Sequence, residues 1–297
     1  MATGTTAAYV EVQGLVKCFG GDRVVDDVSF SVPKGNFVTL LGPSGCGKTT
    51  TLMSIAGLHS IDAGQIRVGG IVYTAPKQGL FMPPEKRDIG MVFQSYAIWP
   101  HMTVAQNVAY PLEIRSVPRP EIDARVADAL RLVGLADMAG KLATQLSGGQ
   151  QQRAALARAI VSQPRLLLFD EPLSNLDLKL REQMRVELKR IQNEVGITSI
   201  YVTHDQAEAL VMSDEIIVMS KGHIQQRGNP HEIYARPVNA YVSNFIGVAN
   251  LLRGRIITAN GAGGGEIEIA QNGKRVQFPC RLAAGVREGE EAVLSVR

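Results

Sequence analysis

Short apolar runs alternate with amphipathic stretches along most of the chain, a pattern typical of an α/β fold. Continuous apolar runs predict buried parallel strands, and they lie at 37–41, 89–93, 166–169, 199–203 and 215–219. Ahead of the first run, 9–16 and 24–32 predict a pair of strands around a turn at 19–22, and 64–73 predicts more strand. We therefore expect an α/β unit built on a mostly parallel sheet.

Apolar residues at helical spacing predict an amphipathic helix over 121–133 and a long one over 180–195, each followed by a glycine. A further helix is predicted over 151–162, where a proline ends it. The stretch 95–120 carries several prolines and is predicted to be irregular. Together these features indicate a mostly helical insertion, at about 95–163, in the α/β unit.

Composition narrows the class of protein only a little. The chain has 297 residues, 45% of them hydrophobic, which is enough for one large domain and a smaller one. Its net charge of +3 is too small to indicate nucleic-acid binding by bulk electrostatics. Cys18, Cys46 and Cys280 form no paired framework and suit a reducing compartment. Because no stretch of 18 apolar residues occurs, we expect a chain that does not span a membrane by itself.

The stretch 42–50 reads Gly-Pro-Ser-Gly-Cys-Gly-Lys-Thr-Thr and fits the phosphate-loop pattern G-x-x-x-x-G-K-[ST]. It lies between a predicted strand and a predicted helix, where backbone N–H groups and the helix dipole favour a phosphate. Lys48 is predicted to reach the β- and γ-phosphates, and the Thr49 hydroxyl is placed for Mg²⁺. A glycine-rich turn with an accidental lysine is the alternative, and it does not account for this setting. The predicted nucleotide-binding residues are Gly42, Pro43, Ser44, Gly45, Cys46, Gly47, Lys48, Thr49 and Thr50.

A second glycine-rich helix start follows at Ser147, Gly148, Gly149 and Gln150. One interpretation is another anion-binding helix terminus, with the Ser147 hydroxyl as a donor. The other is an ordinary helix start without a ligand, because Ser-Gly-Gly is also common where helices begin.

Polar residues stand where three predicted strands end. Asp170 and Glu171 follow the run 166–169, and we expect Asp170 to hold Mg²⁺ and Glu171 to orient or deprotonate the attacking water. Two adjacent carboxylates are more often a solvated turn, but the buried strand and the phosphate loop upstream favour the catalytic interpretation. Gln94 and His204 end two other strands, the edge at which α/β sheets bind ligands. A strand cap for Gln94 and a structural histidine for His204 are the simpler alternatives.

Taken in order, these motifs resemble those of the ATP-binding subunit of an ABC transporter, over about residues 9 to 250. The resemblance implies a P-loop NTPase of the ABC-cassette type. It identifies 42–49 as the Walker A loop, Gln94 as the Q-loop, 146–150 as the LSGGQ signature, 166–170 as Walker B, Glu171 as the catalytic glutamate, 174–177 as the D-loop, His204 as the switch histidine and Phe19 as the aromatic that stacks on adenine. On the residues alone, Phe19 is equally an ordinary hairpin aromatic. The implied Mg²⁺ ligands are Thr49, Gln94 and Asp170, and Glu171, His204 and Gln94 surround the γ-phosphate.

In this family two cassettes face each other, so that the phosphate loop of one and the LSGGQ of the other close on one ATP. The resemblance therefore implies ATP and Mg²⁺, a homodimer or paired cassette, two integral membrane permease subunits and, indirectly, an extracytoplasmic solute-binding protein. It places the chain at the cytoplasmic face of the cell membrane as a peripheral protein, without nucleic acid. The rivals are a soluble ABC ATPase acting on ribosomes or DNA, and an inactive regulator. A single cassette disfavours the first, and the presence of Glu171 and His204 disfavours the second.

We predict an ATP-binding domain over 1–235 and a partial, OB-like regulatory β domain over 236–297. Strands are predicted at 254–257, 266–270, 274–278 and 293–296, the middle two as a hairpin around Asn272-Gly273. Importers of sugars, polyamines and ferric iron resemble this arrangement. Only about 50 residues of the β domain are present, fewer than a closed barrel needs, so we expect a shortened chain with an open strand edge. The residues Val248-Ala249-Asn250-Leu251 after Phe245-Ile246-Gly247 favour the polyamine and ferric-iron branch, with sugars next.

Overall fold

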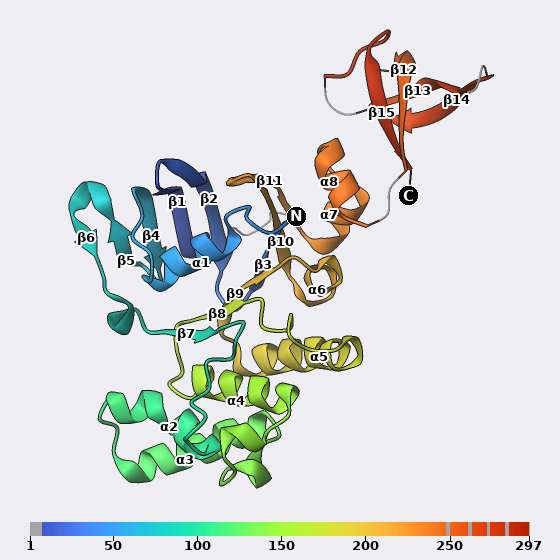
Figure 1. Cartoon of the computed structure of the whole chain (residues 1–297). Helices are drawn as coiled ribbons and strands as arrows, with labels where there is room; N and C mark the ends of the chain where they lie inside the picture. Colours follow the sequence, from blue (N-terminus) through green and yellow to red (C-terminus); the bar gives the residue numbers. More distant parts are fainter. Residues whose placement is uncertain (1–7, 248–249, 261–262, 272–273, 283–284, 297) are drawn as a thin grey trace, which may run out of the picture. The chain divides into compact units, whose positions relative to one another are not determined.

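The computed structural model describes residues 8–247, 250–260, 263–271, 274–282 and 285–296 (Figure 1). The chain forms two compact units, Met1–Ile224 and Gln225–Arg297. The boundary expected from the sequence, at 235, coincides with the end of helix α7 (Pro230–Ala235), whereas the units separate ahead of that helix.

A six-stranded sheet is the centre of the first unit, with the order β11-β10-β3-β9-β8-β7. Its strands are β3 (Phe37–Leu41), β7 (Ile89–Val92), β8 (Leu166–Asp170), β9 (Thr198–Thr203), β10 (Glu215–Ser220) and β11 (His223–Gly228). The strands from β10 to β7 pair in parallel, which confirms the mostly parallel sheet. Every residue of β3, β8 and β9 is buried, as the continuous apolar runs predict. The carboxyl ends of these strands therefore meet at one edge.

A second, antiparallel sheet of the order β2-β1-β4-β5-β6 lies in the same unit. Its strands are β1 (Ala8–Phe19), β2 (Asp22–Pro33), β4 (Ala63–Val68), β5 (Ile71–Ala75) and β6 (Leu80–Phe81), with the short 3₁₀ turns η1 (Pro76–Gln78) and η2 (Pro84–Lys86) after β5 and β6. The hairpin expected at the start is present, with longer strands. The strand structure expected over 64–73 is present as two strands: Gly69 and Gly70 have φ of 55° and 81°, and the tight turn they allow separates β4 from β5.

The helices of the first unit are α1 (Lys48–Ala56), α2 (Val104–Ile114), α3 (Arg119–Leu132), α4 (Gly148–Ile160), α5 (Leu178–Val195) and α6 (Gln206–Met212), with 3₁₀ turns η3 (Ala136–Met138) and η4 (Ala143–Gln145). Helices α2, α3 and α4 pack on one another within the stretch predicted as a helical insertion. Helix α4 begins three residues before the predicted start, because Ser147 already caps it.

Helix α2 contradicts the irregular structure predicted for 95–120. Thr103 caps it, and its hydroxyl accepts from the Gln106 backbone N–H while the Gln106 side chain accepts from the Thr103 N–H. Val104, Val108 and Leu112 recur at a spacing of four and are buried in the core. This cap and apolar stripe outweigh Pro111, which lies inside the helix and removes one backbone donor.

Two hydrophobic cores cover the two faces of the parallel sheet. One contains Phe37, Phe169 and Tyr201 together with residues of the helical insertion and α5. The other contains Leu40 and Leu168 together with α1 and the antiparallel sheet. Burying each such side chain is worth about 1.5–3 kcal/mol, so the central strands are held firmly from both sides.

The second unit contains α7, α8 (Ala240–Phe245) and an antiparallel sheet of the order β14-β13-β12-β15. Its strands are β12 (Asn250–Asn260), β13 (Gly264–Gln271), β14 (Lys274–Arg281) and β15 (Glu291–Val296). The pairing of β13 with β14 confirms the predicted hairpin, whose Asn272-Gly273 turn lies outside the described residues, as do Val248 and Ala249. Val276 and Phe278 are exposed on β14, an edge of this sheet. Among the described helices of the chain, none is long and apolar enough to cross a membrane.

Candidate functional site

The phosphate loop connects buried β3 to α1, as its sequence predicts. Gly47 is the residue before α1, and it has φ of 100°. A side chain there would place its Cβ 2.6 Å from the carbonyl oxygen of Val24, and a Cβ on Gly42 would lie 2.4 Å from that of Met219. Both positions therefore require glycine, and the loop forms a tight cradle of backbone. No side chain caps α1, so its first N–H groups remain available for a phosphate.

Lys48 lies at the base of this cradle and is only 4% exposed. Its ammonium group donates to the carbonyl oxygens of Gly42 (2.8 Å) and Pro43 (2.9 Å). The loop's own carbonyls thus hold the cation in place, while Pro43, Ser44 and Gly45 are exposed above it. The residues fit a bound phosphate: a cradle of glycine backbone, an uncapped helix start and one buried cation.

Thr49 and Asp170 meet although 121 residues separate them. The Thr49 hydroxyl donates to Oδ1 of Asp170 at 2.8 Å, at the end of β8. Burial raises the pKa of Asp170, the Thr49 hydrogen bond opposes that rise, Glu171 adds to it and Lys48 lowers it. A hydroxyl and a carboxylate beside a phosphate cradle are the oxygen ligands that Mg²⁺ prefers, so these residues fit the ion.

Glu171 and His204 form the next pair at the same sheet edge. Nδ1 of His204 donates to Oε2 of Glu171 at 2.9 Å, and the histidine side chain is 52% exposed. Glu171 has φ of 44°, an uncommon value for a residue with a side chain, and its N–H donates to the carbonyl of Val202. This backbone bond to β9 fixes the unusual conformation and directs the carboxylate toward His204.

Gln94 lies just beyond the end of β7 with its side chain exposed. Nδ2 of Asn175 donates to its backbone carbonyl at 2.9 Å, so the predicted Q-loop and D-loop are in direct contact. Phe19 ends β1 and is 44% exposed. Its ring meets His59 edge to face at 5.5 Å, and Nζ of Lys17 lies 5.0 Å from its centre. Strand β2, its hairpin partner, also supplies the Val24 carbonyl that packs on the phosphate loop.

The signature residues lie elsewhere in the first unit. Ser147 caps α4: its hydroxyl accepts from the N–H of Gln150, and the Gln150 side chain accepts from the Ser147 N–H. Ser147 and Gly148 are exposed, and Gly149 packs close to Leu180. In Figure 1, α4 lies among the helices in the lower part and α1 beside the antiparallel sheet above. The structure brings together Lys48, Thr49, Asp170, Glu171 and His204, but not the signature.

A small polar pocket beside Glu171 and His204 includes side chains that the sequence did not single out. These are Arg181, Thr203, Asp205 and Glu208. Asp205 follows the switch histidine directly and is the cap of α6, so a capping signal next to His204 could have indicated it. Nothing in the sequence distinguishes Arg181 from the other arginines of α5.

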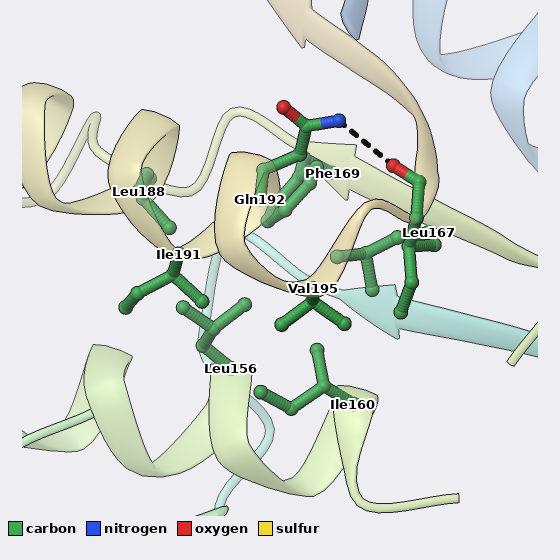
Figure 2. Close-up of a pocket in the computed structure, with 9 residues that line it drawn as sticks. Leu156, Ile160, Leu167, Phe169, Leu188, Ile191, Gln192 and Val195 are labelled. Carbon is green, nitrogen blue, oxygen red and sulfur yellow. Dashed lines mark hydrogen bonds between the residues drawn. The ribbon is translucent and has the colours of Figure 1, made fainter. Parts of the chain in front are cut away.

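A separate cavity is apolar and contains none of the predicted site residues (Figure 2). It lies between α4, α5 and β8, and Figure 2 shows Leu156 and Ile160 facing Ile191 and Val195 across it. Only Gln192 brings a polar side chain, and its Nε2 donates to the carbonyl of Ile197 at 2.8 Å. This layer joins the helix that begins at the signature to the helix that follows the D-loop.

Known proteins share much of this sequence. The sequence model of the ABC transporter family matches residues 25–174. The trehalose/maltose import ATP-binding protein MalK of Thermococcus litoralis is 53% identical over 81% of this chain and 64% of its own length. The spermidine/putrescine import ATP-binding protein PotA of Pseudomonas aeruginosa is 50% identical over 86% of this chain and 69% of its own length. The chain thus spans about two thirds of the length of these relatives.

A solved structure, that of cbiO1 from Clostridium perfringens, is described as part of the ABC transporter complex cbiONQ. It aligns with a TM-score of 0.70 and 28% identity, covering 77% of this chain and 91% of that one. Its likeness agrees with the arrangement of sheets and helices found here.

Proposed function

Because the chain belongs to the ABC transporter family, we propose that it hydrolyses ATP to power the import of a solute through a membrane ABC transporter. The observation that carries the proposal is the convergence of two pairs at the sheet edge next to Lys48. Thr49 meets Asp170 at 2.8 Å, and Glu171 meets His204 at 2.9 Å. These residues come from three separate stretches of the sequence, and phosphoryl transfer needs this combination of cation, metal ligands and base.

Each residue has a role that follows from its position. Lys48 would exchange its bonds to the loop carbonyls for oxygens of the β- and γ-phosphates, at little cost because it is already buried and oriented. Thr49 and Asp170 would hold Mg²⁺, with Gln94 completing its surroundings. When bound, Mg²⁺ neutralises charge that develops on the phosphate oxygens.

Glu171 would accept the proton of the attacking water, which requires its carboxylate to face the water rather than only His204. The exposed His204 would contact the γ-phosphate from the other side. Phe19, exposed at the hairpin tip, would stack on adenine. Water activation and charge placement thus come from side chains that the parallel sheet already holds together.

We further propose that two cassettes form the working unit, each giving its phosphate loop to one ATP and its Ser147–Gln150 turn to the other. The exposure of Ser147 and Gly148 supports this, because an anion site at that helix start is accessible to a second chain. In this proposal the cassette pair docks on two integral membrane subunits at the cytoplasmic face of the membrane, and a solute-binding protein acts on it indirectly.

The test of the catalytic proposal is Glu171→Gln, which removes the base and keeps the shape. We expect Mg²⁺-dependent hydrolysis to fall by about 10²–10⁴-fold while ATP still binds, because general-base catalysis contributes that much. Release of phosphate by the full chain and binding of a fluorescent ATP analogue measure the two properties. Hydrolysis by Glu171→Gln at the wild-type rate would remove Glu171 from the proposed role.

For the solute, we propose the polyamine and ferric-iron branch first, with a sugar as the second candidate. The stretch after Phe245-Ile246-Gly247 supports the first, and the 53% identity to a trehalose/maltose relative supports the second. Vesicles that hold the cognate membrane subunits decide between them, with binding proteins loaded with polyamine, ferric iron or sugar added in turn. Stimulation of hydrolysis by a sugar-loaded protein alone would overturn the first choice and leave the catalytic proposal intact.

A further inference from the structure

The polar pocket beside Glu171 and His204 joins two segments that the proposed mechanism treats separately. It is lined by residues 171 and 174 of the segment before α5, by Arg181 of α5, and by residues 203, 204, 205 and 208 around the start of α6. Arg181 is the lining residue that bonds to both segments, through different nitrogens of its guanidinium group.

On one side, Nη2 of Arg181 donates to the backbone carbonyls of Leu176 (3.1 Å) and Ser174 (3.4 Å). These carbonyls belong to the D-loop segment, 174–177. On the other side, Nη1 lies 3.5 Å from Oδ2 of Asp205. The rigid guanidinium fork therefore spans from the D-loop to the residue next to His204.

The two carboxylate oxygens of Asp205 make different interactions, one with the start of α6 and one with two arginines. Oδ1 accepts from the N–H groups of Ala207 and Glu208 and caps α6. Oδ2 receives Arg181 and, at 2.7 Å, Nη2 of Arg185. Its own N–H donates to Thr203 on the other side of His204. A hydrogen bond between Thr203 and Asp205, the two neighbours of His204, thus fixes the backbone there. Arg181 and Arg185 both contact Asp205.

The D-loop end is tied to the same site. The Ser174 hydroxyl donates to the carbonyl of Glu171 at 2.9 Å. A closed circuit results: Glu171 to Ser174, Ser174 to Arg181, Arg181 to Asp205, and back through His204 to Glu171.

The position of Arg181 near the start of α5 brings its side chain within reach of both loops. It lies in the first turns of α5, where the helix dipole disfavours a cation. The rest of α5 is anchored by the apolar layer against α4 and β8 (Figure 2), so the start of the helix is a firm support. Arg181 is thus a cation near the start of a well-anchored helix, and its bonds connect the D-loop segment to Asp205.

We infer that Arg181 is a positioning residue that couples the D-loop segment 174–177 to the His204–Glu171 pair. Displacement of the D-loop carbonyls moves Asp205, and with it the histidine that occupies the Glu171 carboxylate. The state of the D-loop thereby determines when Glu171 faces the water. This inference rests on the proposed function, in which Glu171 is the base.

The test compares Arg181→Met with Arg185→Met in the full chain. Both remove a cation from Oδ2 of Asp205, and Arg185 makes the shorter contact, but Arg181 is the one bonded to the D-loop carbonyls. Because Arg181 is partly exposed, its loss should leave the fold intact. Asp205→Asn is the second variant: asparagine keeps the helix cap and loses the charge.

We expect Arg181→Met to lower kcat for ATP about tenfold with little change in KM, and Arg185→Met to lower it less. Asp205→Asn should match Arg181→Met. In a His204→Ala background, Arg181→Met should change kcat by less than about twofold, because the path through Asp205 and His204, on which the coupling depends, is already cut. An equal loss in both backgrounds, or a loss with Arg185→Met as large as with Arg181→Met, would overturn the inference.

Hydrogen exchange without nucleotide separates this inference from the proposed function. Arg181→Met should raise deuterium uptake in peptides covering both 172–178 and 203–207, whereas Arg185→Met should raise it in the second alone. Unchanged uptake at 172–178 in Arg181→Met would contradict the coupling, even if the chain proved to hydrolyse no ATP. If wild-type chain and Glu171→Gln were equally inactive while uptake changed as expected, the proposed function would fail and the coupling would stand.

Discussion

The starts of α1 and α4 are both glycine-rich helix termini, yet they are built in opposite ways. At α1 a glycine in a left-handed conformation precedes the helix, no side chain caps it, and a buried lysine stands ready inside the cradle. At α4 the terminus is closed by its own residues, because Ser147 and Gln150 cap each other's backbone. The first has the features that we propose for an anion site, and the second is a stable helix start whose hydroxyl would have to leave its cap to bind a phosphate.

This difference is consistent with our proposal that one chain contains two parts of a site that do not meet within that chain. The phosphate loop is joined within the chain to Asp170, the proposed metal ligand, and the proposed base Glu171 is bonded to His204 at the same sheet edge. The signature is joined to its own helix and, through the apolar layer of Figure 2, to α5. Substitutions at the two starts should therefore affect binding and hydrolysis differently.

The largest expected effect is that of Lys48→Ala, in the phosphate loop at the start of α1. Removing the buried cation should lower kcat/KM for ATP by about 10²–10³-fold and weaken ATP binding by the isolated chain, because a preorganised charge on the phosphates is lost. Phosphate release and nucleotide titration measure both. Lys77→Ala, at an exposed lysine of η1, is the control and should behave as wild type. Normal hydrolysis by Lys48→Ala would mean that α1 is not the phosphate site.

Ser147→Arg tests the start of α4, and its effects on ATP binding and on hydrolysis should differ from those of Lys48→Ala. We expect hydrolysis to fall by at least about tenfold, as on loss of one transition-state donor, while ATP binding by the isolated chain stays within twofold of wild type. The matched control is Thr144→Arg, which adds the same charge at an exposed position three residues earlier. Weakened binding in Ser147→Arg but not in the control would place the two helix starts on one nucleotide within one chain.

A smaller effect is expected at the adenine end of the first site. Phe19→Ala should raise KM for ATP about tenfold, since stacking of a base on an aromatic ring is worth roughly 1–3 kcal/mol. Phe19→Tyr keeps the ring and should keep KM. A KM that does not respond to loss of the ring would assign Phe19 to the hairpin alone.

The smallest effect concerns stability. Burial raises the pKa of Asp170, so ionisation costs the folded state free energy at every pH above the ordinary value of the carboxyl. Asp170→Asn keeps an acceptor for Thr49 and removes that charge, and should raise the free energy of unfolding of the nucleotide-free chain by about 0.5–2 kcal/mol at neutral pH. Below the ordinary pKa of aspartate the gain should vanish. Denaturant unfolding at neutral and acidic pH provides the comparison, and a loss of stability at neutral pH would be the contrary result.

Much of the candidate site around the phosphate loop could be predicted, because continuous apolar runs indicate buried parallel strands. The residues that follow such strands are then expected at the same edge of the sheet. The strands before Gln94, Asp170 and His204 show this directly. The prediction failed where a local feature outweighed composition, because the Thr103–Gln106 capping box builds α2 in a proline-rich stretch. The turn at Gly69-Gly70 that separates β4 from β5 was also not predicted. The link between Arg181 and Asp205 could not be found from the sequence, because it joins residues of α5, the D-loop and the start of α6 that have no common pattern.

The central claim is that the two helix starts complete one site only across two chains. Mixing Lys48→Ala chains with Ser147→Arg chains tests it most directly, because a mixed pair has one site with both defects and one with neither. With random pairing, half of the pairs are mixed, and activity should rise toward about a quarter of that of the wild type. Activity in the mixture that equals the average of the two separate variants, with both folded and paired, would contradict the claim.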